Sequence, residues 1–192
     1  MARKIYSDQE LLDFSEEHVM YELNIFRWLV DAIPSTKKDF QLSAYLESFA
    51  IHLRGLIDFF FTLPKDAKND DVIAADFFDP ASPWIPGVLS ASLKDARERT
   101  NKEVGHITYK RKTGMDPTKP WPVGSLFNEI VPVARKFADD ASGKKLHPSV
   151  VRYLKSDGKQ MLIGALLAST VSTNTSAVMI VGTSVSPLKK TP

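Results

Sequence analysis

The sequence contains no cysteine among its 192 residues. Disulfides, metal sites built on thiolates and cysteine nucleophiles are therefore excluded, and a reducing compartment is compatible with this composition. The sequence also has little excess of either charge, because it contains 25 basic and 23 acidic residues and its net charge is only +2. So small an excess does not provide the broad cationic surface of a nucleic-acid or membrane binder, and any such binding has to be local.

The motifs of the best-known catalytic and metal sites are missing too. The sequence has no glycine-rich phosphate loop, no dinucleotide fingerprint, no paired-histidine zinc helix and no calcium loop. Its histidines, His18, His52, His106 and His147, lie far apart in the chain. We therefore expect no bound metal and no cofactor. Residues 1–10 are polar and lack the apolar stretch of a secretory signal, so we expect a cytoplasmic protein.

The overall composition is that of an ordinary globular protein, with 43% hydrophobic and 25% charged residues. A chain of this length can bury one sizeable core. We expect a helical domain over residues 1–160, followed by a Ser/Thr-rich tail over residues 161–192 with no charge between Lys159 and Lys189. Polar residues 169–176 interrupt the tail, which disfavours a transmembrane helix and leaves a β-hairpin or a loosely ordered segment.

Two long helices are predicted in the first third of the chain. Ser7 and Glu10 have the spacing of a capping box ahead of a periodic apolar face, and Pro34 ends that pattern, so the first helix is expected over residues 7–33. The second helix is expected over residues 40–62. Its second half is apolar almost all round, as in a helix buried at the centre of a bundle.

The rest of the domain is predicted as a long loop and three further helices. The loop, residues 65–87, carries prolines and the aromatic residues Phe78 and Trp84, which we expect to pack over the core, although they and Trp121 could stack on bases. Apolar periodicity then predicts helices over residues 88–109, 122–141 and 148–154. The predicted fold is thus an all-α bundle of four to five helices with a long loop.

Arg99 and His106 are the best candidates for chemistry. Seven residues make nearly two turns at about 3.6 residues per turn, so both side chains are expected on one face of the helix over residues 88–109. Histidine titrates near neutrality and can move a proton, whereas arginine can hold a phosphoryl group with two parallel donors. This pair indicates phosphodiester cleavage.

These residues resemble the HEPN superfamily, small helical bundles whose ribonuclease members carry an arginine, then four to six residues, then a histidine. Six residues separate Arg99 from His106, Asn101 lies between them as a polar residue often does there, and Tyr109 follows the histidine by three positions. The resemblance covers about residues 7–141. It implies that Arg99 and His106 are the catalytic residues of a metal-independent endoribonuclease from a bacterial defence or toxin system.

The same resemblance implies RNA as the substrate and a homodimer that brings two motifs together. It also implies a cognate antitoxin or defence partner, and no membrane. Asn101, Lys102 and Tyr109 are the candidates to contact RNA beside the catalytic pair. Arg54, on the helix over residues 40–62, is a further candidate if it reaches a polar site shared with the next helix.

A second interpretation assigns these residues structural roles. Arg99 can pair with Glu103 and Arg54 with Asp58, each four residues apart on a helix, and His106 can bond a nearby carbonyl. The protein would then be a non-catalytic binding or scaffold bundle. Whether Arg99 and His106 face a cleft or are engaged by internal partners distinguishes the two interpretations. A membrane-tethered protein is a third interpretation, which depends wholly on the tail.

Overall fold

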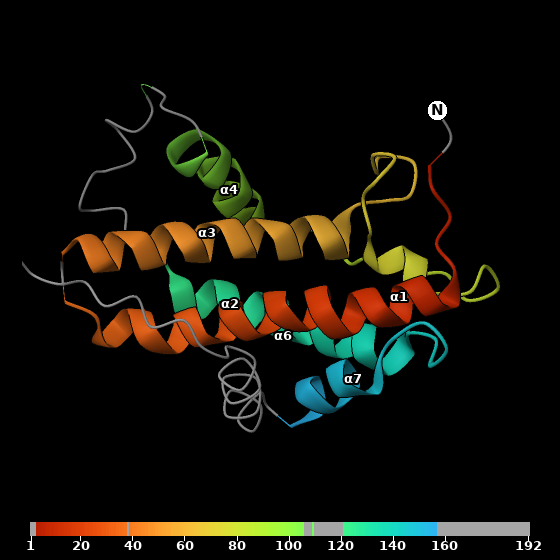
Figure 1. Ribbon diagram of the computed structural model, residues 1–192. Helices are drawn as coiled ribbons and strands as arrows, with labels where there is room; N and C mark the ends of the chain where they lie inside the picture. The colour runs from red at the N-terminus through yellow and green to blue at the C-terminus, as the bar shows by residue number, and fades with distance from the viewer. Residues whose placement is uncertain (1–2, 38, 106–108, 110–120, 157–192) are drawn as a thin grey trace, which may run out of the picture. The chain divides into compact units, whose positions relative to one another are not determined.

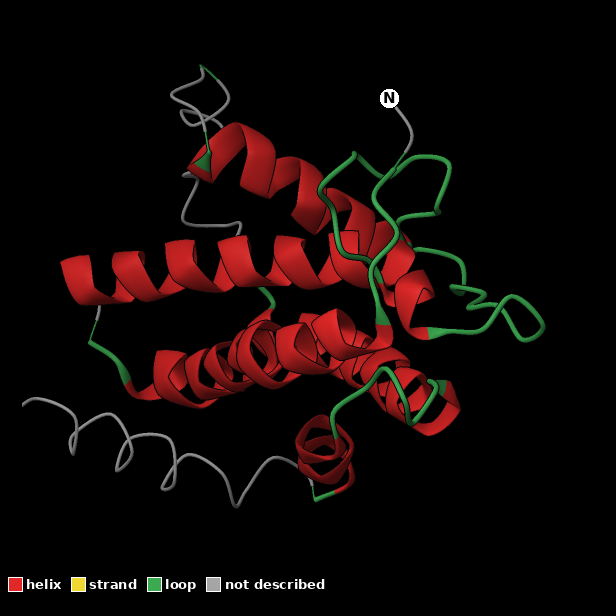
Figure 2. Ribbon diagram, turned by 45° about the vertical axis from the view of Figure 1, so that its right-hand side comes forward, coloured by secondary structure: helices red, strands yellow, loops and turns green. Residues whose placement is uncertain are grey.

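The computed structural model describes residues 3–37, 39–105, 109 and 121–156. These residues all belong to one compact unit, Met1–Gln160. They form helices and loops without any β-strand (Figures 1 and 2), so the fold is an all-α helical bundle. Five helices are present in this part of the chain when α1 and α2, which follow one another without a break, are counted as one.

The first helix consists of α1 (Asp8–Phe14), a π-helical turn η1 (Ser15–Val19) and α2 (Met20–Ala32). Ser7 caps it as predicted: its hydroxyl accepts a hydrogen bond from the Glu10 amide, and the Glu10 carboxylate accepts one from the Ser7 amide. A single 3₁₀ turn, η2 (Ile33–Ser35), follows and contains Pro34. The proline thus ends the helix where the sequence predicted.

Helix α3 (Phe40–Phe61) is the central element, and it packs against α2, α4 and α6. Figure 1 shows it lying between α4 on one side and α1 and α2 on the other. The part of α3 from Phe49 onward carries its fully buried side chains, Phe49, Ala50, Leu53, Leu56, Ile57 and Phe60. The N-terminal half is much more exposed, with Phe40 at 95%.

The loop between α3 and α4 closes one end of the core with its aromatic side chains. A short 3₁₀ helix, η3 (Ala74–Phe77), buries Phe77, and Phe78 and Trp84 are buried beside it. The Trp84 indole nitrogen donates to the Phe60 carbonyl at 2.8 Å. The prediction that this loop packs over the core is therefore confirmed, and Phe78 and Trp84 are not surface platforms for bases.

Helix α4 (Ala91–Arg99) continues into a second π-helical turn, η4 (Thr100–Val104). The predicted start at residue 88 was wrong: Val88 is 98% exposed, and Ser90 caps the helix by accepting a hydrogen bond from the Leu93 amide. Apolar spacing alone extended the helix too far because it does not locate the capping residue.

The last two helices are α6 (Val123–Asp140) and α7 (Pro148–Lys155), close to their predicted bounds. Pro122 is the N-cap of α6. Pro132 lies inside α6, and the helix continues past it. Helix α6 packs against α2, α3, α4 and α7, so its buried face completes the core.

The predicted tail, residues 161–192, lies outside the described residues, so its predicted forms stay predictions. Within the part of the chain that the structure describes, no helix is both long enough and apolar enough to cross a membrane.

Candidate functional site

Arg99 lies at the C-terminal end of α4, where Glu103 and Trp121 are among the residues that hold it. Its Nε lies 3.3 Å from each carboxylate oxygen of Glu103, one helical turn further on. Its guanidinium carbon stands 4.2 Å from the centre of the Trp121 ring, a cation–π distance. Only 13% of the Arg99 side chain and 17% of the Glu103 side chain are exposed. Arg99 is thus an oriented, largely covered cation.

The local backbone explains why Arg99 is fixed. Thr100, 2% exposed, directs its hydroxyl to the Ala96 carbonyl at 2.8 Å and to the Ala50 carbonyl of α3 at 3.3 Å. This contact anchors the start of η4 to the central helix. In the π-helical turn that follows, hydrogen bonds span five residues, as from the Gly105 amide to the Thr100 carbonyl at 2.9 Å, a departure from α-helical geometry that is common at functional sites.

The other residues of the predicted motif are placed differently. Asn101 is half-buried in η4, Lys102 is exposed, and Tyr109 is 81% exposed. His106 lies outside the described residues, so the structure gives no geometry for the pair of Arg99 and His106. The prediction that the two side chains share one face stays a prediction.

Arg54 takes part in a surface ion-pair network between α3 and α4. Its Nε lies 3.5 Å from Asp58, and Arg97 of α4 pairs with the same carboxylate. The Arg54 side chain is 45% exposed. The predicted pair with Asp58 is confirmed, and Arg54 lies on the outer face of α3.

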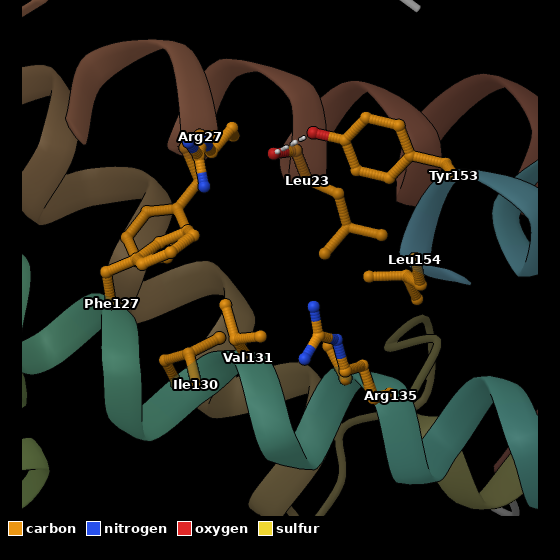
Figure 3. Close-up of a pocket in the computed structure, with 10 residues that line it drawn as sticks. Leu23, Arg27, Phe127, Ile130, Val131, Arg135, Tyr153 and Leu154 are labelled. Atoms are coloured by element: carbon orange, nitrogen blue, oxygen red, sulfur yellow. Dashed lines mark hydrogen bonds between the residues drawn. The ribbon is translucent and has the colours of Figure 1, made fainter. Parts of the chain in front are cut away.

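The sequence did not predict a pocket that lies between α2, α6 and α7 (Figure 3). Its cavity has a volume of about 230 Å³. The walls are mainly apolar, with Leu23, Ile130, Val131 and Leu154 among them. Helix α2 is far from α6 and α7 in the sequence, so no local motif marks the pocket.

Two arginines flank this pocket from different helices. Arg27 of α2 has its guanidinium carbon 5.0 Å from the centre of the Phe127 ring and donates to Asp31 at 3.0 Å. Arg135 of α6 is exposed, and Figure 3 shows its guanidinium pointing from the helix into the space between α6 and α2. A periodic apolar pattern on α6 predicted a core face, but it could not show that a cation stands at the edge of that face.

Tyr153 of α7 closes the upper wall of the pocket. Its hydroxyl donates to the Leu23 carbonyl at 3.3 Å, the bond drawn in Figure 3. Burial raises the pKa of Tyr153 to about 12, so the phenol is neutral at physiological pH. The wall near Leu23 is thus polar at one point and carries no negative charge there.

A second polar contact joins α2 and α3. The Glu22 carboxylate lies 2.8 Å from Nδ1 of His52, whose side chain is only 14% exposed, and Tyr21 meets the His52 ring edge-on. The pair connects the two helices that pack most closely. Among the described residues, no group of three or more His, Cys, Asp or Glu side chains is placed to hold a metal ion.

Comparisons with known proteins identify no relative. No family model, no curated protein and no solved structure matches this chain. The site therefore has to be interpreted from its own residues.

Proposed function

We propose that this chain is a HEPN-like protein that cleaves RNA without a metal ion, with Arg99 and His106 as its catalytic residues. The observation that supports the proposal is the fixed position of Arg99 at the end of α4, on a helix packed against the central α3 of an all-α bundle. Electrostatic stabilisation of a transition state depends on cations that are oriented before the substrate arrives, and Glu103 and Trp121 orient this one.

The contacts of Arg99 are compatible with phosphate binding. Both hydrogen bonds to Glu103 use Nε, and a planar guanidinium is the group that binds phosphate oxygens with parallel hydrogen bonds. His106 would take the proton of the RNA 2′-hydroxyl or give one to the leaving oxygen. Arg99 would stabilise the negative charge that develops on the phosphorus oxygens.

Further parts of the proposal concern substrate and assembly. Lys102 and Tyr109, both exposed, would contact the RNA backbone and a base, with Asn101 between them and the catalytic pair. Arg54 would add positive charge from the neighbouring helix. A homodimer would bring two motifs together, in a cytoplasmic defence or toxin system with a cognate antitoxin as partner.

A second candidate function is favoured by a specific observation. Arg99 is 87% covered, since 13% of its side chain is exposed, and its positive charge is balanced by Glu103. In this second function, the role of Arg99 would be structural: it would hold η4 against the bundle. The protein would then be a non-catalytic helical binding or scaffold protein.

The two functions are separated by cleavage of a mixed RNA pool in EDTA by the full chain. We expect the wild type to cut RNA and His106→Ala to lose activity by about 10²–10⁴-fold, the usual contribution of a general acid or base. Arg99→Lys, which keeps the charge and loses the planar donors, is expected to lose most of the activity as well.

The matched control is His18→Ala, because His18 is an exposed histidine on η1, away from α4. It should cleave RNA at the wild-type rate, and circular dichroism should show all four proteins equally folded. If the wild type cleaves no RNA under any of these conditions, or if His106→Ala cleaves as fast as the wild type, the catalytic proposal is wrong and the binding protein is favoured.

A further inference from the structure

A second cavity lies between the first helix, α3 and the loop after α3, and it shares no lining residue with the pocket between α2, α6 and α7. We propose that this second cavity binds a small arylalkyl amine, with the ammonium group at the Glu22 carboxylate and the hydrocarbon part against the apolar walls. The inference does not depend on the proposed ribonuclease activity, because none of the described residues that line the cavity belongs to α4 or η4.

The walls of the cavity indicate the hydrocarbon part of the ligand. Phe14 and Val19 come from the first helix, Leu56 and Phe59 from α3, and Val72 from the loop. Val19 is 4% exposed and Leu56 is 1% exposed, so the core fixes both and an apolar ligand would meet preformed walls. The rings of Phe14 and Phe59 can pack against an aromatic ligand, and the face of such a ring also attracts a positive charge.

The charges of the wall indicate a cation. Of the described residues that line the cavity, Glu22 is the only one with a carboxylate, and none is a lysine or an arginine. The other polar side chain of the wall, His18, is 56% exposed and already has a negative charge near it, because its Nε2 lies 3.9 Å from Glu17. The Glu22 carboxylate is therefore the group to which a ligand with an ammonium group would bind.

His52 orients this carboxylate and leaves it able to accept further hydrogen bonds. Nδ1 of His52 lies 2.8 Å from Oε2 of Glu22, and this is the one hydrogen bond to the carboxylate within the part of the chain that the structure describes. A carboxylate offers about four acceptor positions, so an ammonium group can donate to it beside His52. The His52 side chain is only 14% exposed, which fixes the pair between α2 and α3.

Gly55 lines the cavity beside Glu22 and lies inside α3, where glycine is less favourable than alanine. A Cβ placed at Gly55 would have Oε2 of Glu22 as its near neighbour among the described residues, at 3.6 Å, an ordinary contact distance. The packing of the helices therefore does not require a glycine here. The missing side chain instead leaves a surface that a ligand can approach closely, next to the carboxylate.

The volume sets the size of the ligand. A cavity of about 150 Å³ holds a benzene molecule, so one of about 330 Å³ corresponds to roughly a dozen non-hydrogen atoms. 4-Phenylbutylamine has this size, and its four-carbon chain separates the ring from the ammonium group. 4-Phenylbutan-1-ol has the same skeleton without the charge, and 4-phenylbutanoate carries the opposite charge.

The test uses 4-phenylbutylamine as the probe and the full chain with labelled methyl groups. NMR titration should show saturable shifts at the methyl groups of Val19, Leu56 and Val72. 4-Phenylbutan-1-ol should shift the same methyl groups but bind about fivefold more weakly, as expected for the loss of one partly exposed ion pair. 4-Phenylbutanoate should not bind at this site, because its charge is repelled by Glu22.

Variants locate the two parts of the ligand. Glu22→Gln keeps an acceptor for His52 and is expected to weaken binding of the amine by about fivefold, with binding of the alcohol unchanged. Gly55→Leu should abolish binding of both, because its side chain occupies the cavity. Glu47→Gln is the matched control: Glu47 is an exposed glutamate of α3 that does not line the cavity, and this variant should bind the amine as the wild type does.

Circular dichroism establishes that each variant is folded, and four results would overturn the proposal. The first is the absence of saturable shifts at these methyl groups in the wild type. The second is equal binding of the amine and the alcohol to the wild type and to Glu22→Gln, which would indicate an apolar cavity without recognition of a cation. The third is a loss of binding in Glu47→Gln as large as in Glu22→Gln, which would indicate general attraction of a cation to the surface. The fourth is wild-type binding of the amine by folded Gly55→Leu, which would place the ligand elsewhere.

Discussion

Arg99 and Glu103 form a largely covered ion pair at the junction of α4 and η4, with Nε 3.3 Å from both carboxylate oxygens. The pair gives Arg99 a fixed direction, but it also places a negative charge where a phosphate would have to approach. If Arg99 acts on RNA, the negative charge of Glu103 opposes the approach of the phosphate. If Arg99 only holds the bundle together, Glu103 stabilises the fold. Removing the charge of Glu103 therefore distinguishes the two functions.

Glu103→Gln keeps a hydrogen-bond acceptor for Arg99 and removes the competing charge. If Arg99 contacts RNA, cleavage at low substrate should rise by about two- to fivefold, which is what 0.5–1 kcal/mol of added transition-state binding gives. The thermal midpoint should fall at the same time, because Arg99 loses its ionic partner. The measurement is initial-rate cleavage beside a melting curve.

Glu98→Gln is the control for this prediction, since Glu98 is an exposed glutamate of the same helix. It makes the same change in net charge away from the Arg99 side chain. A rise in cleavage for both variants would indicate a general charge effect on RNA binding. A lower melting point for Glu103→Gln without any change in cleavage would favour a purely structural role of the pair.

Much of the fold could be predicted from local chemistry. Ser7 and Glu10 cap the first helix as their spacing indicated, Pro34 ends it, and the apolar stretch ending near Phe61 is the buried central helix. These features depend on neighbours in sequence. The π-helical turns η1 and η4 were not predicted, because they depend on how each helix is held by the rest of the bundle, as Thr100 is by the Ala50 carbonyl.

The candidate site was predictable only in part. The partners of Arg99 at Glu103 and of Arg54 at Asp58 are one helical turn away, so spacing indicated both. The contact of Arg99 with Trp121 crosses 22 positions of sequence, and nothing in the residues between them indicates it. The pocket at Arg135 depends on three helices meeting, which periodicity does not specify.

The capping box at the start of α1 makes a pH-dependent contribution to stability. Hydrogen bonds from the Ser7 backbone, Lys4 and the Ser7 side chain lower the pKa of Glu10 from 4.5 to about 2. The folded state thus binds the proton less readily than the unfolded chain does, so the stabilisation is present above about pH 4.5 and is lost as the pH falls towards 2.

Glu10→Gln should remove this part of the acid sensitivity. Urea unfolding at pH 6 and pH 3 should show a smaller loss of stability for Glu10→Gln than for the wild type. Ser7→Ala should cost about 1 kcal/mol at pH 6, the usual value for an N-cap. An acid-induced loss as large in Glu10→Gln as in the wild type would show that the capping box does not contribute to it.

Tyr153 makes the opposite contribution at alkaline pH. Its pKa is about 12 in the folded protein because the phenol is buried, whereas the ordinary pKa of a tyrosine is 10. The unfolded chain therefore loses the proton first, and stability falls as the pH rises from 10 towards 12. Tyr153→Phe should be less stable by about 0.5–1.5 kcal/mol at pH 7.5, because it loses the bond to the Leu23 carbonyl.

The difference in the free energy of unfolding between Tyr153→Phe and the wild type should narrow as the pH rises above 10, since the variant cannot ionise at this position. Urea unfolding at pH 7.5 and pH 10.5 measures this difference. Tyr21→Phe is the control, because Tyr21 is 56% exposed. A gap that stays constant over this range would show that the phenol of Tyr153 ionises equally readily in the folded and unfolded states.

Phe137 of α6 joins the loop aromatics to the central helix and should be the most sensitive position in the core. It is fully buried, and its ring lies within 6.0 Å, centre to centre, of the rings of Phe59, Phe60, Phe77, Phe78 and Trp84. Phe137→Ala would leave a cavity that side chains from three segments border. We expect a loss of about 3–5 kcal/mol in the free energy of unfolding.

Phe40→Ala is the matched control, because Phe40 is 95% exposed at the start of α3, and it should change stability by no more than about 0.5 kcal/mol. Trp84 fluorescence reports the local effect, since Trp84 contacts Phe137 edge-on. Its emission should shift to longer wavelength in folded Phe137→Ala and stay unchanged in Phe40→Ala. Equal losses of stability in the two variants would mean that the loop aromatics do not pack on α6. This result would contradict the conclusion that the loop closes one end of the core.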